Sequence, residues 1–302
     1  MDFKNIILGR LKIYKMKASI IGYGEWGKKI INTLNLLGNI ELKYICKRNK
    51  YQSIQNNYNF VYDYRSAITN DLNFVIICTL PDLNFEIAKY ALNKKIHVFI
   101  EKPVCLRNED YLYLYNLSLK NNLCLHTNYI HLYNKNFNCF IEKFKSEFNT
   151  NYEAEIHLGS SMKERKYLDL YFDWMPHILS FLNAVETNFD YDISNFNVIK
   201  FDKKKIYKLK LIINGNTYSI SFGNGFDKKK TMFKIISNNK SLEYCDNFTK
   251  FNGEIISNNQ EPTPLYNSLE AFCANIEKQN TYNLFDKITE IMNDINLKTF
   301  NC

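Results

Sequence analysis

Three glycines near the start of the chain are spaced as a dinucleotide-binding loop requires. Gly22, Gly24 and Gly27 follow an apolar run at 17–21 and lead into a helical pattern at 27–37. In such a loop the first glycine makes the tight turn, the second lets backbone approach a pyrophosphate, and the third lets helix and strand pack closely. We therefore predict that phosphates bind at this helix N-terminus. The alternative is a glycine-rich turn without a ligand.

A lysine with a possible catalytic role follows a later strand-like run. Glu101, Lys102 and Pro103 come directly after residues 97–100. The strand would end there at the carboxyl edge of a parallel sheet, where ligands of open α/β folds bind. An ammonium group in that position can stabilise negative charge developing on a reacting oxygen. The alternative is a surface lysine beside a proline-terminated strand.

Asp173 and His177 are the candidate acid–base residues. Imidazole titrates near neutral pH, so His177 can accept an alcohol proton and return it. Asp173 could orient His177 or bind the substrate hydroxyl. The segment also reads as a helix start, with Asp173 as the cap and Pro176 in the first turn. His177 has its own alternative, a hydrogen-bonded histidine at a domain interface, and His126 or His131 could line the same cleft.

The end of the second predicted strand indicates which cofactor binds. An acidic residue there usually binds the ribose 2′-hydroxyl of NAD, whereas a basic residue suits the 2′-phosphate of NADP. This chain has Lys47 and Arg48 at that point, so we predict a preference for NADP over NAD. A solvated basic turn is the alternative, and Asn49 could still bind a ribose.

The elements that must hold these residues alternate between strand and helix over the first 125 residues. Strand-like runs occur at 17–21, 41–46, 73–79, 97–100 and 123–126, and helical patterns at 27–37, 83–93 and 107–120. Apolar strands separated by helices predict a parallel sheet covered on both faces. We therefore expect an α/β protein whose residues 16–126 form a Rossmann domain, a doubly wound parallel sheet. Residues 1–15 are interpreted as an N-terminal extension before Met16.

The second half of the chain has a different pattern. Strand-like segments occur at 153–158, 196–201, 207–213, 217–222 and 232–236, and helices are expected at 264–278 and 284–297. Asn214-Gly215 is the dipeptide that a two-residue hairpin of the primed type requires. Residues 127–302 are thus expected to form an α+β domain with an open, mainly antiparallel sheet. Both closing helices are expected to pack back on the first domain.

Composition excludes several classes of protein. The 302 residues suffice for about two domains, and the net charge of +8 comes with only short basic runs, which disfavours nucleic-acid binding. The eight cysteines show no metal-binding spacing, so no metal is expected and a reducing, cytoplasmic location is favoured. No run of eighteen apolar residues exists, which argues against a membrane span.

Four motifs in order resemble the Gfo/Idh/MocA oxidoreductase family: the glycine loop, Thr79-Leu-Pro-Asp-Leu-Asn84, Glu101-Lys-Pro103 and Asp173-Trp-Met-Pro-His177. The resemblance implies hydride transfer between a nicotinamide and a hydroxyl- or carbonyl-bearing carbon of a sugar or sugar nucleotide. It also implies roles for the matching residues. The implied cofactor contacts are Gly22, Gly24, Glu25, Trp26, Gly27, Lys47, Arg48, Thr79, Pro81, Asn84, Glu101 and Lys102. The implied substrate contacts are Lys102, Asn128, Asp173 and His177, of which Lys102, Asp173 and His177 are also catalytic.

Some residues depart from the family pattern, which leaves the substrate open. Bulky residues at 170–172 and Met175 replace glycines, Asn84 stands where histidine is frequent, and Leu132 stands where many relatives have arginine. Two other functions therefore remain: a catalytically silent nucleotide-binding sensor or partner protein, and a reductase of a non-sugar ligand such as a linear tetrapyrrole.

The resemblance further suggests a homodimer or homotetramer formed through the open face of the second sheet. Ile206, Leu209, Leu211 and Ile213 could supply part of that surface. The alternative is that helices of the same chain cover these residues.

Overall fold

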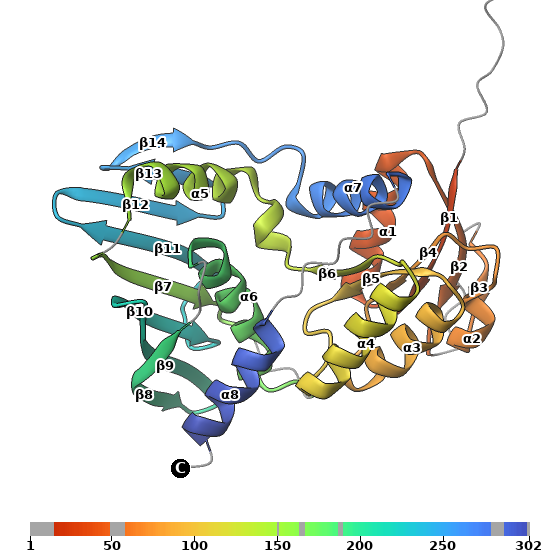
Figure 1. Ribbon diagram of the computed structural model, residues 1–302, viewed down its shortest axis with the longest axis horizontal. Coiled ribbons are helices and arrows are strands. Elements are labelled where there is room, and N and C mark those ends of the chain that lie inside the picture. Colours follow the sequence, from red (N-terminus) through yellow and green to blue (C-terminus); the bar gives the residue numbers. More distant parts are fainter. Residues whose placement is uncertain are drawn as a thin grey trace, which may run out of the picture.

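The computed structural model consists of two lobes, each built on one β-sheet (Figure 1). The structure describes residues 15–48, 58–149, 151–162, 167–186, 190–278 and 287–300. The expected extension at 1–15 lies outside these ranges except for Lys15, and Asn49 lies outside them as well. Within these ranges no helix has the length and apolar character needed to cross a membrane.

The sheet of the first lobe has six parallel strands in the order β3-β2-β1-β4-β5-β6. Its strands are β1 (Met16–Ile21), β2 (Ile40–Cys46), β3 (Phe60–Val61), β4 (Phe74–Ile77), β5 (His97–Glu101) and β6 (Leu125–Asn128). This is the order of a dinucleotide-binding Rossmann fold, in which ligands bind where the order reverses, here between β1 and β4. The predicted doubly wound parallel sheet is thus confirmed.

Helices cover both faces of this sheet because alternate strand residues point to opposite sides. They are α1 (Glu25–Leu37), α2 (Tyr64–Ala67), α3 (Pro81–Asn93) and α4 (Asn108–Lys120). Ile20 and Phe74 pack with α1, whereas Val75 and Ile77 pack with α3 and α4. Both sets of strand residues are buried, which explains the continuous apolar runs in the sequence.

The sheet of the second lobe has eight strands in the order β14-β13-β12-β11-β7-β10-β9-β8. Its strands are β7 (Glu153–Gly159), β8 (Tyr191–Phe201), β9 (Lys204–Ile213), β10 (Asn216–Gly223), β11 (Lys230–Ser237), β12 (Lys240–Cys245), β13 (Phe248–Phe251) and β14 (Glu254–Ser257). Asn214 and Gly215 have φ angles of 51° and 83°, so the predicted primed hairpin between β9 and β10 is confirmed. The mainly antiparallel arrangement is confirmed too, with one parallel pair, β7 and β10.

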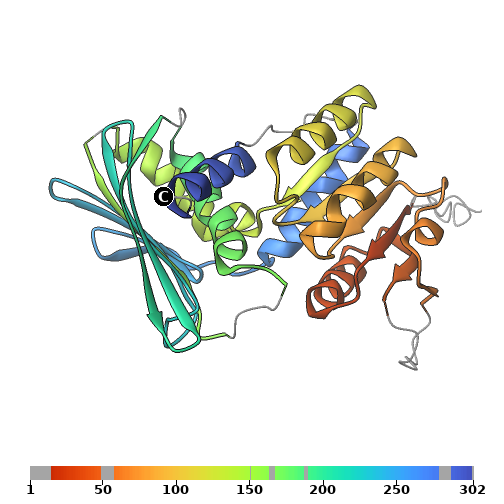
Figure 2. The same cartoon turned by 90° about the horizontal axis from the view of Figure 1, so that it is seen from below.

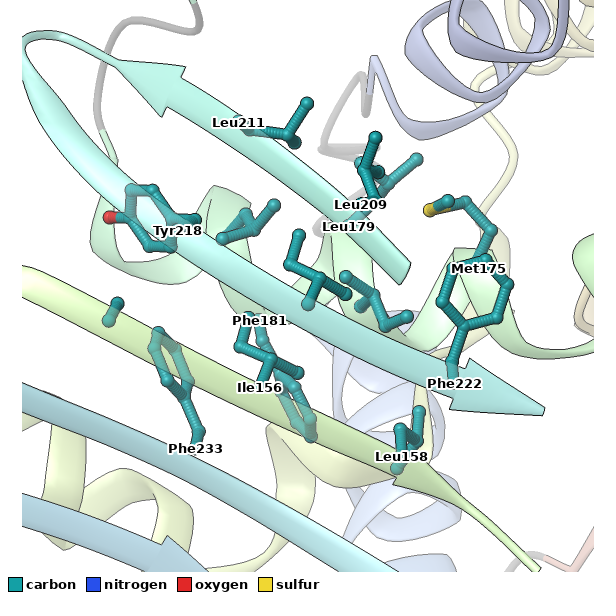
Figure 3. Packing of buried hydrophobic residues seen from close by; sticks show 14 of the residues in the cluster. Ile156, Leu158, Met175, Leu179, Phe181, Leu209, Leu211, Tyr218, Phe222 and Phe233 are labelled. Atoms are coloured by element: carbon teal, nitrogen blue, oxygen red, sulfur yellow. The ribbon is translucent and has the colours of Figure 1, made fainter. Parts of the chain in front are cut away.

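Three helices cover one face of the second sheet, between that sheet and the first lobe (Figure 2). They are α5 (Lys135–Glu147), α6 (Leu170–Val185) and α8 (Ile288–Phe300). Leu209, Leu211 and Ile213 lie at 2% exposure or less in the core beneath these helices, as Figure 3 shows for the two leucines. The prediction that they contribute to a subunit interface was therefore wrong, because helices of the same chain cover them.

The two closing helices pack in different places. α7 (Pro264–Glu277) packs on the first sheet, where the Phe272 ring lies edge-on to Phe74 and Phe99 with centroids 5.3 and 5.5 Å apart. α8 differs from the expected position because Ile291 and Met292 belong to the core of the second lobe, next to α6. Among the described C-terminal residues, α7 thus packs on the Rossmann sheet, whereas α8 lies mainly against α6 and also contacts α4 of the first lobe.

His126 is buried between the first sheet and α7, and its burial predicts acid sensitivity. Its ring stacks on Phe99 at 5.0 Å, its Nε2 lies 3.1 Å from Ser268 Oγ, and burial lowers its pKa to about 4. The unfolded chain binds this proton near pH 6.5. Stability is thus fully present above pH 6.5 and is lost as the pH falls toward 4.

We expect this histidine to contribute roughly 2 kcal/mol to the loss of unfolding free energy between pH 7.5 and pH 5. Urea unfolding at the two pH values measures the loss. In His126→Gln the loss should be smaller by that amount, whatever the substitution costs at pH 7.5. An equal loss in both proteins would show that His126 is not the responsible group.

Candidate active site

A cavity of about 760 Å³ lies between the two lobes. The first lobe contributes the start of α1 and the ends of β4, β5 and β6, while the second contributes α6, the strand ends of its sheet and the loop before α7. Seven of the predicted site residues line it: Trp26, Thr79, Glu101, Lys102, Asn128, Asp173 and His177. The topology thus brings together residues that are up to 151 positions apart in the sequence.

The glycine loop leaves open space at the N-terminus of α1. Gly22 has a φ of +112°, and a Cβ there would lie 2.4 Å from the Cys78 carbonyl oxygen. A Cβ on Gly27 would lie 2.2 Å from the Gly22 carbonyl oxygen, whereas on Gly24 it would meet no described atom within 4 Å. No side chain of the described residues caps this helix. The first-turn amides, including that of Glu25, therefore face a space that fits the pyrophosphate of a dinucleotide.

Lys102 forms an ion pair with Asp173 across the two lobes. Lys102 Nζ lies 2.9 Å from Asp173 Oδ1 and 2.8 Å from the Asp173 carbonyl oxygen, and both side chains are largely buried. Pro176 lies inside α6 and has no N–H to donate to the Phe172 carbonyl oxygen one turn earlier. The lysine reaches both a side-chain and a backbone oxygen of Asp173.

Asp173 does not cap α6, so the structure contradicts the alternative interpretation of this residue. The helix begins at Leu170, and Asp169 Oδ1 accepts the Tyr171 N–H at 2.7 Å. Asp173 lies one turn further along the helix, where its carboxylate points to Lys102. Pro176 accordingly lies inside α6 rather than in its first turn. The capping alternative for Asp173 is thus excluded, which removes a purely structural reason for its presence.

His177 lies one turn beyond Asp173 on the same face of α6 and is 8% exposed. Its ring packs edge-on to that of His131, with centroids 5.0 Å apart. His131 belongs to the 3₁₀ helix Ile130–Tyr133, and burial lowers its pKa to about 4 although Asp246, at 3.6 Å, opposes the shift. His131 is therefore an uncharged neighbour of His177 at neutral pH.

Glu101 and Asn128 form a buried network at the base of the cavity. Glu101 accepts hydrogen bonds from Trp26 Nε1 and, at 2.6 Å, from Asn128 Nδ2. Asn128 Oδ1 accepts one from Ser268 Oγ at 2.9 Å. Burial raises the pKa of Glu101, and the two donors oppose that shift. The network links the glycine loop, the end of β5 and α7, so it holds the neighbouring Lys102 in place.

Asn84 lies behind the cavity wall rather than on it. It is 1% exposed, its Oδ1 accepts a hydrogen bond from Thr79 Oγ1 at 2.8 Å, and its Nδ2 donates to the Pro103 carbonyl oxygen at 3.1 Å. It thus positions two loops and does not line the cavity, a difference from the predicted direct cofactor contact. Pro81 is the first residue of α3 and lines a smaller cavity of about 290 Å³, next to Thr79 and Lys102.

Lys47 and Arg48 follow β2, at the edge of the first lobe where an adenosine ribose would lie. Lys47 is 9% exposed and its ammonium lies over the Phe60 ring, 4.7 Å from the centroid. Arg48 is exposed. Of the two predicted phosphate contacts, Arg48 is therefore the one whose guanidinium can approach a ligand from solvent.

The second-lobe wall also contains polar residues that were not predicted from the sequence, among them Ser160, Asn224, Lys229 and Asp246. Ser160 and Asn224 directly follow β7 and β10, which run parallel and therefore end at the same edge of the sheet. Lys229 precedes β11 and lies 2.6 Å from Asp246, which follows β12. Polar residues at strand ends were a usable signal, but only with the strand order known.

Residues 16–129 match the profile of a family described as "Oxidoreductase family, NAD-binding Rossmann fold" (GFO_IDH_MocA). Over residues 16–129 the chain is therefore similar to the Gfo/Idh/MocA oxidoreductase family. The matched region contains the first three of the four motifs, and the fold that the family description names binds a nicotinamide dinucleotide. No curated protein sequence matches the chain.

Solved structures of dehydrogenases and reductases share the fold over the whole chain. UDP-N-acetylglucosamine 3-dehydrogenase from Acidithiobacillus ferrooxidans has a TM-score of 0.80 at 15% identity, covering 94% of this chain and 98% of its own. Biliverdin reductase from Synechocystis, crystallised with biliverdin and NADP+, has a TM-score of 0.75 at 13% identity. The match covers 92% of this chain and 94% of the reductase. Levoglucosan dehydrogenase in complex with NADH and L-sorbose has a TM-score of 0.78 at 13% identity. The match covers 95% of this chain and 97% of the dehydrogenase. At these identities the Gfo/Idh/MocA-type neighbours show the fold alone.

Proposed function

We propose that the protein is an NADP-dependent dehydrogenase or reductase that acts on a hydroxyl- or carbonyl-bearing carbon of a sugar or sugar nucleotide. The observation that carries the proposal is the Lys102–Asp173 ion pair in the cavity between the lobes, with His177 one helical turn away. A nicotinamide bound at the glycine loop supplies or accepts the hydride. A protein that only binds a nucleotide has no need of such an acid–base group.

Each of the three residues has a distinct role in this proposal. Lys102 donates a hydrogen bond to the reacting oxygen and stabilises its negative charge. His177 holds the proton that leaves or enters the same oxygen. Asp173 fixes the Lys102 ammonium through its carboxylate and carbonyl oxygens, at 2.9 and 2.8 Å. Because both partners are largely buried, the pair keeps its geometry in a region of reduced screening.

The cavity wall favours a polyhydroxylated substrate over a tetrapyrrole. Lysines and carboxylates are equally represented: Lys29, Lys102, Lys135 and Lys229 stand against Glu101, Asp173, Asp246 and Glu261. Much of the remaining polar wall consists of asparagine side chains, which bind hydroxyl groups as donors and acceptors. A strongly basic, aromatic-lined pocket would be expected for an acidic tetrapyrrole, and this wall is mixed in charge.

We expect Arg48→Ser to weaken NADP binding about 10- to 100-fold and to leave NAD binding within about twofold. The guanidinium would lose charge-assisted hydrogen bonds to the 2′-phosphate, which NAD lacks. Fluorescence titration with both reduced cofactors measures the two dissociation constants. Arg65→Ser, an exposed arginine on α2, is the matched control. Tighter binding of NAD than of NADP by the unsubstituted protein would contradict the assignment.

A substrate screen tests the proposed reaction directly. Sugars and nucleotide sugars, with biliverdin as the tetrapyrrole arm, are incubated with NADP or NADPH while the absorbance of the reduced nicotinamide is followed. Turnover of a sugar that disappears in Lys102→Met supports the proposal. Turnover of biliverdin alone would favour the tetrapyrrole reductase. NADP binding with no turnover of any compound would favour the nucleotide-binding protein.

A further inference from the structure

Asn224 lines the cavity, and its amide nitrogen is buried without a hydrogen-bond partner among the described residues. Asn224 is 1% exposed and follows Gly223, the last residue of β10. Native proteins leave few buried donors unsatisfied, because each one costs the equivalent of about 10- to 100-fold in an equilibrium constant. An acceptor that a ligand brings to the floor of the cavity would remove this cost.

The orientation of the Asn224 amide is fixed by backbone contacts. Its Oδ1 accepts the Lys205 N–H at 2.7 Å, so exchanging the oxygen and nitrogen would place two donors against each other. The backbone N–H groups of Asn224 and Gly225 both donate to the Lys205 carbonyl oxygen, at 3.0 and 3.1 Å. A Cβ on Gly225 would lie 2.6 Å from Ile206 Cγ1. The chain thus holds this corner rigidly and turns the NH₂ group away from Lys205.

Trp174 lines the same cavity and has a second buried donor of this kind. Its Nε1 is buried and has no hydrogen-bond partner in the described part of the chain, and the residue directly follows Asp173 on α6. An indole N–H and an amide NH₂ can donate hydrogen bonds and cannot accept them. Two donor-only groups in one cavity favour a ligand oxygen that only accepts.

We propose that Asn224 and Trp174 belong to a substrate subsite for an oxygen that only accepts hydrogen bonds, carried away from the reacting carbon. Such an oxygen occurs in the carbonyl of an N-acyl group and in a carboxylate. The inference rests on the proposed function, because it adds a specificity determinant to the same cavity. The Lys229–Asp246 ion pair on this wall has no net charge, so the wall can accommodate either the neutral carbonyl of an N-acyl group or a carboxylate.

Asn224→Asp is the sharpest test of this subsite. The substitution keeps an oxygen for the Lys205 N–H and the shape of the side chain, and replaces the free donor by an acceptor. Calorimetry in the presence of NADP compares UDP-glucose, UDP-N-acetylglucosamine and UDP-glucuronate, together with the three free sugars. Asn197→Asp, on the exposed part of β8, carries the same change of charge and is the matched control.

We expect the unsubstituted protein to bind the N-acetyl or the carboxylate probe about 10- to 100-fold more tightly than the glucose parent. Asn224→Asp should abolish that preference, Trp174→Phe should reduce it, and Asn197→Asp should keep it. The preferred probe identifies the source of the oxygen. Equal affinities for all three compounds, no measurable binding of either oxygen-bearing probe, or a preference that survives in Asn224→Asp would each overturn the proposal.

Because the readout is binding, the test separates this inference from the proposed function. A preference lost in Asn224→Asp without any change in nicotinamide absorbance would support the subsite and count against the oxidoreductase proposal. Turnover that depends on Lys102, combined with equal affinities for the three UDP-sugar probes, would support the oxidoreductase proposal and contradict the subsite.

Discussion

Replacing Lys102 by methionine is expected to lower kcat about 1,000-fold and to leave the NADP dissociation constant within about threefold. The Lys102 ammonium is held at 2.9 Å from Asp173 Oδ1 and lines the cavity. Its proposed contribution is made only when charge develops on the reacting oxygen, so its loss should reduce kcat rather than ground-state binding. Methionine keeps most of the apolar stem that packs in the wall.

The measurement is the rate of change of nicotinamide absorbance with the best compound from the substrate screen. Lys94→Met removes the same charge from the end of α3, outside the cavity, and should keep full activity. Since Lys102→Met leaves the Asp173 carboxylate largely buried without its cation, Lys102→Met/Asp173→Asn controls for that effect. A kcat within fivefold of the original in Lys102→Met would exclude the lysine from the chemistry.

The first lobe could be predicted almost completely from the sequence because local pattern and tertiary environment agree there. Strands buried on both faces read as continuous apolar runs, and the glycine loop follows directly from the stereochemistry of β1 and α1. Gly27 illustrates this agreement, since a Cβ would lie 2.2 Å from the Gly22 carbonyl oxygen. Two of the three glycines that suggested a nucleotide site, Gly22 and Gly27, are thus also required by packing.

The second lobe was harder to predict because its functional wall depends on strand order. β7 and β10 are separated by α6, β8 and β9 in the sequence, yet they pair in parallel and end side by side. That pairing places Ser160 next to Asn224, and no spacing in the sequence implies it. Strands β12 to β14 were missed as well because they are short, and helix α5 was missed although Phe137, Phe140 and Phe144 recur at helical spacing.

The alternating apolar residues of β9 also show a limit of prediction from sequence. Alternation establishes that Leu209, Leu211 and Ile213 share one face, but it does not tell what covers that face. Here α6 and α8 do. The helix start near Asp173 was expected one turn too late, because the sequence offers both Asp169 and Asp173 as capping residues and Asp169 is the one that caps α6, while the Asp173 carboxylate binds Lys102.

The second large effect is expected at Gly24, where Gly24→Val should abolish detectable NADP binding and leave the fold intact. A Cβ there meets no described atom within 4 Å, and the residue has a φ of −80°, which any amino acid adopts. The side chain would instead occupy the space proposed for the pyrophosphate, so affinity should fall at least 100-fold. Calorimetry with NADP and thermal unfolding of the unliganded protein measure the two properties separately.

Substitutions of two other glycines serve as controls for this prediction. Each should change the stability of the unliganded protein, the property that Gly24→Val is expected to leave intact. Gly27→Ala forces a Cβ to 2.2 Å from the Gly22 carbonyl oxygen and should destabilise the unliganded protein by several kcal/mol, on the order of an overpacked core. Gly38→Ala, at a φ of +74° with open space around it, should cost about 1 kcal/mol through backbone strain and leave NADP affinity unchanged. If Gly24→Val bound NADP normally while melting like the original protein, the cofactor phosphates could not lie at the start of α1, and the site would have to be sought elsewhere along the cavity.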